Sequence, residues 1–396
     1  MNHISVNSEI SNCSGCGACF AACPKNAISM VCDVYGNKYA DVNKEQCVNC
    51  GKCLDVCSYS SAVNKTMPLK AYAAISVSRE VAKNSASGGV FASLAESCIK
   101  CGASAAGAIM ECSKDGVQVY HSITDNNISA MQGSKYVQSD AWKIYNDVVL
   151  AIKEGRTVLF SGTPCQVNAI KKLTGDPENL ITIDLICHGV PSLQMLNDYV
   201  DITSRRFMGI VNSICFRDKT VKKNFTARIE IKRNNKTKDF YLRSRFMSFY
   251  KLFLEGAIYR ESCYSCQFAG IERVSDITIG DYWGIEQFHA DDIKDYDVPE
   301  KNDWSCILVN TKKGQDFLDK HMESLLSFES NIQWVKEYNA QLNRPSQKSD
   351  NRDKYLQLYR SGGYDAIERQ FIKENGGYIK FYRRMIKSIY SLGKRV

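Results

Sequence analysis

A duplicated cysteine motif near the start of the chain limits its possible folds more than any other feature. The segment CSGCGACFAAC, from Cys13 to Cys23, recurs as CVNCGKCLDVC, from Cys47 to Cys57. Both copies have the spacing C-x-x-C-x-x-C-x-x-x-C, with which ferredoxins bind 4Fe–4S clusters, and the fourth cysteine of each copy binds the cluster of the other. The sequence therefore predicts a ferredoxin-like domain in residues 1–66.

The duplicated motif assigns eight ligands to two 4Fe–4S clusters. One cluster is expected to be held by Cys13, Cys16, Cys19 and Cys57, and the other by Cys47, Cys50, Cys53 and Cys23. Paired C-x-x-C motifs also bind tetrahedral zinc. Zinc is the weaker interpretation, because a zinc site has no use for eight cysteines in this duplicated order.

The interpretation of the 18 cysteines depends on the cellular compartment of the protein. The chain has no apolar run of the roughly 20 residues that a membrane span needs, and its first residues lack the basic and apolar segments of a signal peptide. We therefore expect a cytoplasmic protein without a transmembrane segment. In a reducing compartment, so many cysteines indicate metal binding rather than disulfides.

The charge of the chain gives little support for nucleic-acid binding. The formal net charge is +8, but this value counts every cysteine as neutral. An oxidised 4Fe–4S core with four thiolates carries a charge of about −2, so bound clusters reduce the excess. The basic charge is also local, because residues 217–245 hold eleven Lys/Arg and three Asp/Glu.

The rest of the chain alternates helical and strand patterns, which is typical of an α/β domain. We assign residues 70–310 to this domain, with a basic β-hairpin inserted at 217–245, and residues 311–396 to a helical C-terminal region. The expected fold class is therefore α+β. The hairpin could steer an acidic partner by long-range attraction. Alternatively, its lysines could prevent edge-to-edge aggregation.

Short motifs in the α/β domain carry a family resemblance. They are SGG (87–89), GSKYVQS (133–139), SGTPCQ (161–166), CHGVPS (187–192), FRDK (216–219), and a C-x-x-C followed by DITIGDYWG (263–284). In this order they resemble the coenzyme F-420 hydrogenase/dehydrogenase beta-subunit family, in its version with a fused N-terminal ferredoxin. A tryptophan that the family has shortly after FRDK is absent here.

The resemblance implies an FAD-containing iron–sulfur oxidoreductase. Electrons would pass between the clusters and FAD, and a hydride would be exchanged with a small substrate or a deazaflavin-like coenzyme. A redox partner protein, either a ferredoxin or another subunit, is also implied. Two alternatives remain: an electron-transfer subunit without flavin chemistry of its own, and a ligand-binding scaffold in which the clusters are structural.

Three motifs are candidates for the FAD site. Ser87, Gly88 and Gly89 precede a predicted helix, whose free N–H groups suit a phosphate of FAD, although a plain helix cap is the simpler interpretation. Lys135 is suited to a pyrophosphate or an isoalloxazine edge, unless it is merely solvated. Thr163 follows a buried strand, where α/β proteins bind ligands. No G-x-G-x-x-G occurs, so a Rossmann nicotinamide site has no support.

A third 4Fe–4S cluster is predicted beside the flavin. Its expected ligands are Cys165, Cys187, Cys263 and Cys266. The C-x-x-C pair fixes two neighbouring ligands, and two strand ends supply the others. Most of the support for this third cluster comes from the family resemblance. Packed or reactive thiols are the alternative. We expect the remaining cysteines to be ordinary thiols: Cys32, Cys98, Cys101, Cys112, Cys215 and Cys306.

His188, which directly follows Cys187, is the candidate proton donor to the flavin or the substrate. An imidazole with a pKa near 6.5 changes its protonation state near physiological pH. A structural histidine is the alternative.

Overall fold

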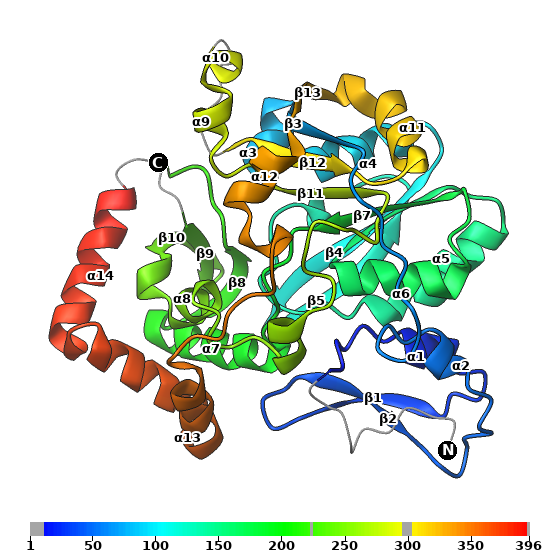
Figure 1. Cartoon of the computed structure of the whole chain (residues 1–396). Helices are drawn as coiled ribbons and strands as arrows, with labels where there is room; N and C mark the ends of the chain where they lie inside the picture. The colour runs from blue at the N-terminus through cyan, green and yellow to red at the C-terminus, as the bar shows by residue number, and fades with distance from the viewer. Residues whose placement is uncertain (1–11, 222–224, 295–302, 394–396) are drawn as a thin grey trace.

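The computed structural model describes residues 12–221, 225–294 and 303–393 (Figure 1). Figure 1 shows a small N-terminal unit at the bottom, a large sheet with covering helices above it, and a second, smaller sheet with the last helices at one side. This mixed architecture confirms the α+β class and the N-terminal ferredoxin-like domain.

The N-terminal unit consists of one hairpin and two very short helices. Its elements are α1 (Ala18–Ala22), β1 (Ile28–Cys32), β2 (Lys38–Val42) and α2 (Lys52–Asp55), with β1 and β2 antiparallel. Gly17 and Gly51 precede the two helices with φ of 76° and 78°, a conformation that glycine adopts most readily. A Cβ atom at Gly17 would lie 2.5 Å from the Cβ of Trp142, so this turn packs directly against the larger unit.

An eight-stranded mixed sheet forms the centre of the larger unit. Its strand order is β13-β3-β12-β11-β7-β6-β4-β5, and only the β4–β6, β6–β7 and β7–β11 pairs are parallel. The strands are β3 (Lys70–Ser76), β4 (Ser104–Ser113), β5 (Gly116–Thr124), β6 (Val158–Gly162), β7 (Leu180–Leu185), β11 (Ile277–Asp281), β12 (Ser305–Val309) and β13 (Leu325–Ser330). Every residue of β6 and β12 is buried, because helices cover both faces.

The helices divide between the two faces of this sheet. Leu94 of α4 and Leu318 of α11 pack on one face, whereas Ile170 of α6 and Val335 of α12 pack on the other. The helices are α3 (Arg79–Asn84), α4 (Val90–Lys100), α5 (Tyr145–Lys153), α6 (Pro164–Thr174), α9 (Ile285–Phe288), α10 (Ala290–Ile293), α11 (Lys312–His321) and α12 (Ile332–Tyr338). Strand β13 lies after residue 310, where the sequence predicted only helices. It pairs with β3 at the edge of the sheet.

The basic segment lies in a second sheet with the order β10-β9-β8. Strands β9 and β10 form the predicted hairpin around Asn234 and Asn235, both of which have positive φ, as a tight two-residue turn requires. An apolar core of aromatic residues joins this sheet to four helices. The elements are α7 (Leu193–Phe207), β8 (Ile210–Cys215), β9 (Thr226–Arg233), β10 (Lys236–Arg243), α8 (Ser248–Leu254), α13 (Arg352–Glu374) and α14 (Gly377–Gly393).

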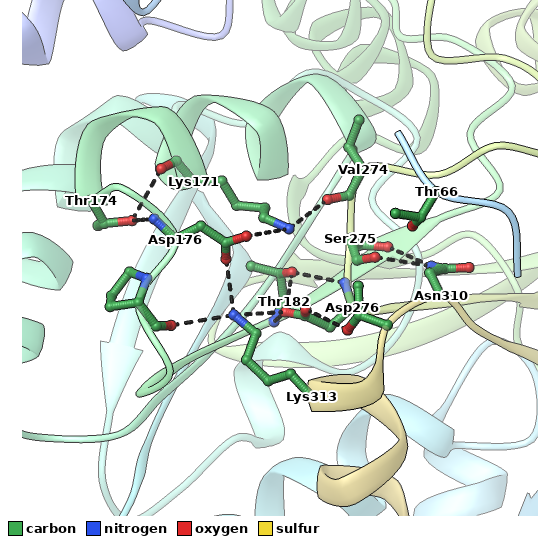
Figure 2. Close-up of polar contacts among 12 residues, drawn as sticks. Thr66, Lys171, Thr174, Asp176, Thr182, Val274, Ser275, Asp276, Asn310 and Lys313 are labelled. Carbon is green, nitrogen blue, oxygen red and sulfur yellow. Dashed lines mark hydrogen bonds and ion pairs between the residues drawn. The ribbon is translucent and has the colours of Figure 1, made fainter. Parts of the chain in front are cut away.

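A buried carboxylate joins two central strands to the start of a helix (Figure 2). Asp276, which is 0% exposed, accepts hydrogen bonds from the backbone N–H and hydroxyl of Thr182, at 2.9 and 2.7 Å. Its other oxygen accepts from the Thr311 hydroxyl at 2.8 Å. The Lys313 ammonium lies 3.6 Å from the oxygen that Thr182 contacts. The carboxylate therefore joins β7, the start of β11 and the start of α11.

We expect Asp276→Ala to lower the free energy of unfolding by about 3 kcal/mol, since the substitution leaves several buried donors without an acceptor. Asp176→Ala is the matched control. Its side chain is 39% exposed and pairs with Lys171 and Lys313 at the rim of the same network, so we expect a loss below about 1 kcal/mol. Anaerobic urea unfolding measures both values. Equal losses would contradict the role assigned to Asp276.

Candidate cofactor site

The structure brings together the four cysteines assigned to the second N-terminal cluster. Cys23, Cys47, Cys50 and Cys53 all line one small cavity at the surface of the N-terminal unit. Cys50 is exposed, and Lys25, Val48 and Lys52 lie at the same cavity. We call these four cysteines the distal set.

The other four N-terminal cysteines also lie close to one another. Burial raises the pKa of the Cys19 thiol, and the neighbouring thiols of Cys16, Cys13 and Cys57 raise it further. Burial likewise raises the pKa of Cys16 to about 12, and Cys165 of the larger unit contributes to that shift. These four cysteines, the middle set, therefore lie beside the larger unit.

Cys165, Cys187, Cys263 and Cys266 meet at one wall of a large cavity, and we call them the cavity set. The cavity has a volume of about 810 Å³. Cys165 lies in the first turn of α6, Cys187 follows β7, and the other two lie in and after the short 3₁₀ helix η4 (Glu261–Ser265). Burial raises the pKa of Cys187, and the thiols of Cys263, Cys165 and Cys266 add to this shift.

Among residues 12–221, 225–294 and 303–393, no three His, Cys, Asp or Glu side chains are arranged to hold one metal ion. The second C-x-x-C is not part of the cavity wall: the Cys98 thiol donates to the Ala95 carbonyl within α4, and Cys101 is exposed.

Arg260 connects the middle set to the cavity set. Its guanidinium, 1% exposed, donates to the carbonyls of Cys13 and Lys38 at 2.9 and 3.0 Å. Its positive charge lowers the pKa of Cys165 and Cys263, against the larger effect of burial. The buried Nε atom has no hydrogen-bond partner among the residues that the structure describes. Arg260 is thus a buried cation between two sets of thiols, and the sequence did not predict it.

Tyr59 also lies between these two sets. Burial raises the pKa of its phenol, and thiols from both sides add to the shift: Cys266, Cys165 and Cys263 from the cavity set and Cys16 from the middle set. Tyr59 lines the large cavity as well. No sequence motif marked this residue.

The start of α4 forms another part of the cavity wall. Ser87, Gly89 and residues 90–92 line the cavity, and the first intrahelical bond runs from the Ser93 N–H to the Gly89 carbonyl. The N–H groups of residues 90–92 therefore precede the hydrogen-bonded part of the helix. Gly88 lies behind this turn. Its N–H donates to the Ser305 hydroxyl at 2.9 Å, and a Cβ atom there would lie 2.5 Å from the Ala74 carbonyl oxygen.

Lys135 lines the cavity but uses its hydrogen bonds locally. Its ammonium donates to the carbonyls of Ala130, Met131 and Gln132 at 3.1, 2.9 and 2.8 Å. Burial lowers its pKa to about 7. All three donors therefore hold the loop after the 3₁₀ helix η1 (Ser129–Met131), whereas the sequence suggested a contact with a pyrophosphate or a flavin edge.

Thr163 takes part in a chain of hydrogen bonds along the cavity wall. Its hydroxyl lies 3.1 Å from both the Cys165 sulfur and the Gln166 Oε1. The Gln166 amide donates to the carbonyl and hydroxyl of Ser139, and the Ser139 hydroxyl contacts His121 Nδ1 at 3.2 Å. The motifs SGTPCQ and GSKYVQS thus meet, and they position Cys165.

Another part of the cavity wall combines His188 with a half-buried ion pair. His188 lines the cavity; burial lowers its pKa, and the nearby Asp281 carboxylate opposes this shift. Asp281 pairs with Arg217, whose guanidinium lies 5.8 Å from the Trp283 ring centre. The motifs FRDK and DITIGDYWG meet at this pair. His188 is therefore neutral at pH 7, facing a cavity with an arginine and a carboxylate.

His121 gives the wall a measurable pH dependence. It is fully buried, its Nε2 lies 3.0 Å from the Ser161 carbonyl, and burial lowers its pKa to about 4. Because the unfolded histidine titrates near pH 6.5, this residue stabilises the fold above that pH, and the contribution is lost as the pH falls toward 4. We expect wild type to lose about 2 kcal/mol relative to His121→Gln between pH 7 and pH 5. Urea unfolding of both proteins at both pH values tests this. An equal change in the free energy of unfolding of wild type and variant between pH 7 and pH 5 would contradict it.

Comparison with known proteins assigns two segments of the chain. A family model described as the C terminus of the coenzyme F420 hydrogenase/dehydrogenase beta subunit matches residues 155–332. A 4Fe–4S dicluster domain matches residues 12–61. Fold and site thus define an iron–sulfur protein of the oxidoreductase class, with a dicluster domain on a mixed α/β body. The match of residues 155–332 to this family model confirms the predicted resemblance.

One solved structure is similar over most of the chain. It is a chain of the F420-reducing [NiFe] hydrogenase complex from Methanosarcina barkeri, with 15% identity and a TM-score of 0.46. The match covers 75% of this chain and 94% of that chain. A search of curated proteins found no match. In the part of the chain that the structure describes, no helix is both long and apolar enough to cross a membrane.

Proposed function

We propose that this chain is an FAD-dependent iron–sulfur oxidoreductase with three 4Fe–4S clusters. The observation that carries the proposal is the cavity set: Cys165, Cys187, Cys263 and Cys266 come from three separate segments and line one cavity together with the start of α4. Neighbouring buried thiols are costly as thiolates, as their raised pKa values show, and binding to iron offsets that cost.

The middle set neighbours both of the other sets, since Cys19 packs in one cluster with Cys23 and Cys53. The distal set is at the surface, and the middle set neighbours the cavity set through Cys16, Cys165 and Tyr59. Bound 4Fe–4S clusters supply one-electron exchange, and FAD exchanges single electrons with them and a hydride with a substrate. The protein's contribution is to space these groups, with the distal set facing a redox partner protein and the cavity facing a small substrate.

The cavity fits FAD in size and in chemistry. Its volume of about 810 Å³ lies within the roughly 300–1,000 Å³ of typical ligand sites. The N–H groups at the start of α4 and the positive end of its dipole suit a phosphate of FAD. Ser87 and Gly89 would lie beside that phosphate, with Gly88 supporting the turn from behind. Lys135 and Thr163 would act by holding the wall in place.

His188 would move a proton in the cavity, whose wall it lines. It is neutral at pH 7, because burial lowers its pKa, so its ring can accept a proton from a bound ligand and return it. The neighbouring Arg217–Asp281 pair would orient a polar substrate beside it. Substitution of His188 by Gln should therefore reduce substrate turnover while the flavin and iron contents remain.

Reduction of the bound flavin through the distal set tests the proposal. We expect reduced ferredoxin to bleach the visible flavin band of the anaerobic holoprotein. In Cys50→Ala, this reaction should be slowed by about 100-fold or more, because the route from the surface is interrupted. Dithionite, which is small enough to enter the cavity, should still reduce the flavin of the variant. Protein that holds clusters but no flavin would contradict the proposal and favour a simple electron-transfer subunit.

A further inference from the structure

Helix α14 has apolar side chains on two opposite faces. Phe381 and Met385 are buried, and the Phe381 ring lies 5.8 Å from that of Phe246 and 5.9 Å from that of Phe371. On the other face, Ile379, Ile386 and Tyr390 are 79%, 48% and 70% exposed. At about 100° per residue, these three positions fall within about 40° of one another. They form an apolar stripe, which we call the outer stripe.

Basic residues lie along one side of the outer stripe. Lys380, Arg383, Arg384 and Lys387 are all exposed, and residues 375–396 contain six Lys/Arg and no Asp/Glu. The basic hairpin extends this surface: burial lowers the pKa of Arg245, and the nearby charges of Arg243 and Arg384, one from each segment, lower it further. Two basic segments that are far apart in the sequence therefore meet on one side of the molecule.

We propose that α14 binds the surface of a membrane that contains anionic phospholipids. A helix that lies in the headgroup region inserts an apolar stripe between the lipids, and the lysines and arginines beside that stripe reach the phosphates. Tyrosine is favoured at that depth. A stable protein interface needs about 800 Å² per partner around a central cluster. A single row of three side chains suits a planar lipid surface better.

Binding to a membrane through α14 would leave the distal set free. Figure 1 shows α14 at the flank of the molecule away from β1, β2 and the N-terminal unit. A protein attached through α14 would therefore keep the distal set accessible to a redox partner. The membrane proposal does not depend on the proposed redox function, because it rests only on α14 and its basic surroundings.

Co-sedimentation of the full-length holoprotein with lipid vesicles tests the inference. We expect binding to vesicles of phosphatidylglycerol and phosphatidylcholine, weakening as salt is raised, and little binding to phosphatidylcholine alone. Ile379→Ser with Ile386→Ser should lower the partition coefficient by about tenfold or more. Leu150→Ser, at an exposed apolar position on α5, is the matched control and should leave it unchanged.

A second pair of variants separates charge from apolar insertion. Arg383→Gln with Lys387→Gln should weaken binding to anionic vesicles and reduce its dependence on salt. Lys312→Gln, at an exposed position at the start of α11, should change neither. Wild type that ignores anionic vesicles would overturn the proposal. Equal vesicle binding by wild type and by the variant with Ile379→Ser and Ile386→Ser would also overturn it. So would dimerisation of the wild type through Ile379 and Ile386.

Discussion

Replacing Cys187 with alanine is expected to remove about four of about twelve irons per chain and to abolish electron transfer between ferredoxin and the flavin. Cys187 lies among Cys263, Cys165 and Cys266, whose thiols all act on its pKa, so its loss leaves a three-cysteine site at the cavity wall. Flavin should remain bound, because the start of α4 is unchanged. Iron and acid-labile sulfide analysis of anaerobic protein, with a stopped-flow measurement of flavin reduction, gives both results.

Cys101→Ala is the matched control for this experiment. It belongs to the other C-x-x-C of the larger unit, it is exposed, and it is not part of the cavity wall. Its iron content and flavin reduction should equal those of wild type. An unchanged iron content in Cys187→Ala would show that the cavity set binds no cluster.

Arg260→Gln is expected to make the clusters beside it harder to reduce, with a fall in reduction potential on the order of 50–100 mV. The guanidinium is a buried positive charge that stabilises the added negative charge of a reduced cluster. Potentiometric titration followed by electron paramagnetic resonance measures the shift.

Two further arginine variants separate tuning of the potential from damage to the fold. Arg260→Lys keeps the charge and should recover most of the potential. Arg206→Gln removes another buried arginine, which pairs with Glu368 in the second sheet unit, and should destabilise the protein without moving the potentials. Equal potentials in Arg260→Gln and wild type would contradict the electrostatic role of Arg260.

The sequence predicted what depends on short-range spacing. The eight N-terminal cysteines lie near one another in two groups of the expected membership, because each motif brings three cysteines together through tight turns and the duplication supplies the fourth. The buried strands β6 and β7 and the hairpin β9–β10 were also predicted, since continuous apolar runs and alternating patterns are local signals. Strand β13 was missed, because its polar, half-exposed sequence pairs only with β3, which lies about 250 residues earlier in the chain.

The parts of the site that depend on long-range contacts were not predicted. Arg260 contacts the carbonyl of Cys13 across most of the chain, and His121 reaches Ser139 and Ser161 from a strand without a motif. Lys135 was singled out as a cation for a ligand, yet the local carbonyls take its three donors. The grouping of the cavity set was expected from the family resemblance, since no local pattern joins Cys165 to Cys263.

Native mass spectrometry of the wild-type chain, purified without oxygen, tests the central claim most directly. The account predicts a dominant species whose mass exceeds that of the polypeptide by three 4Fe–4S clusters and one FAD. A spectrum that shows only two clusters, or zinc in place of iron, would contradict it.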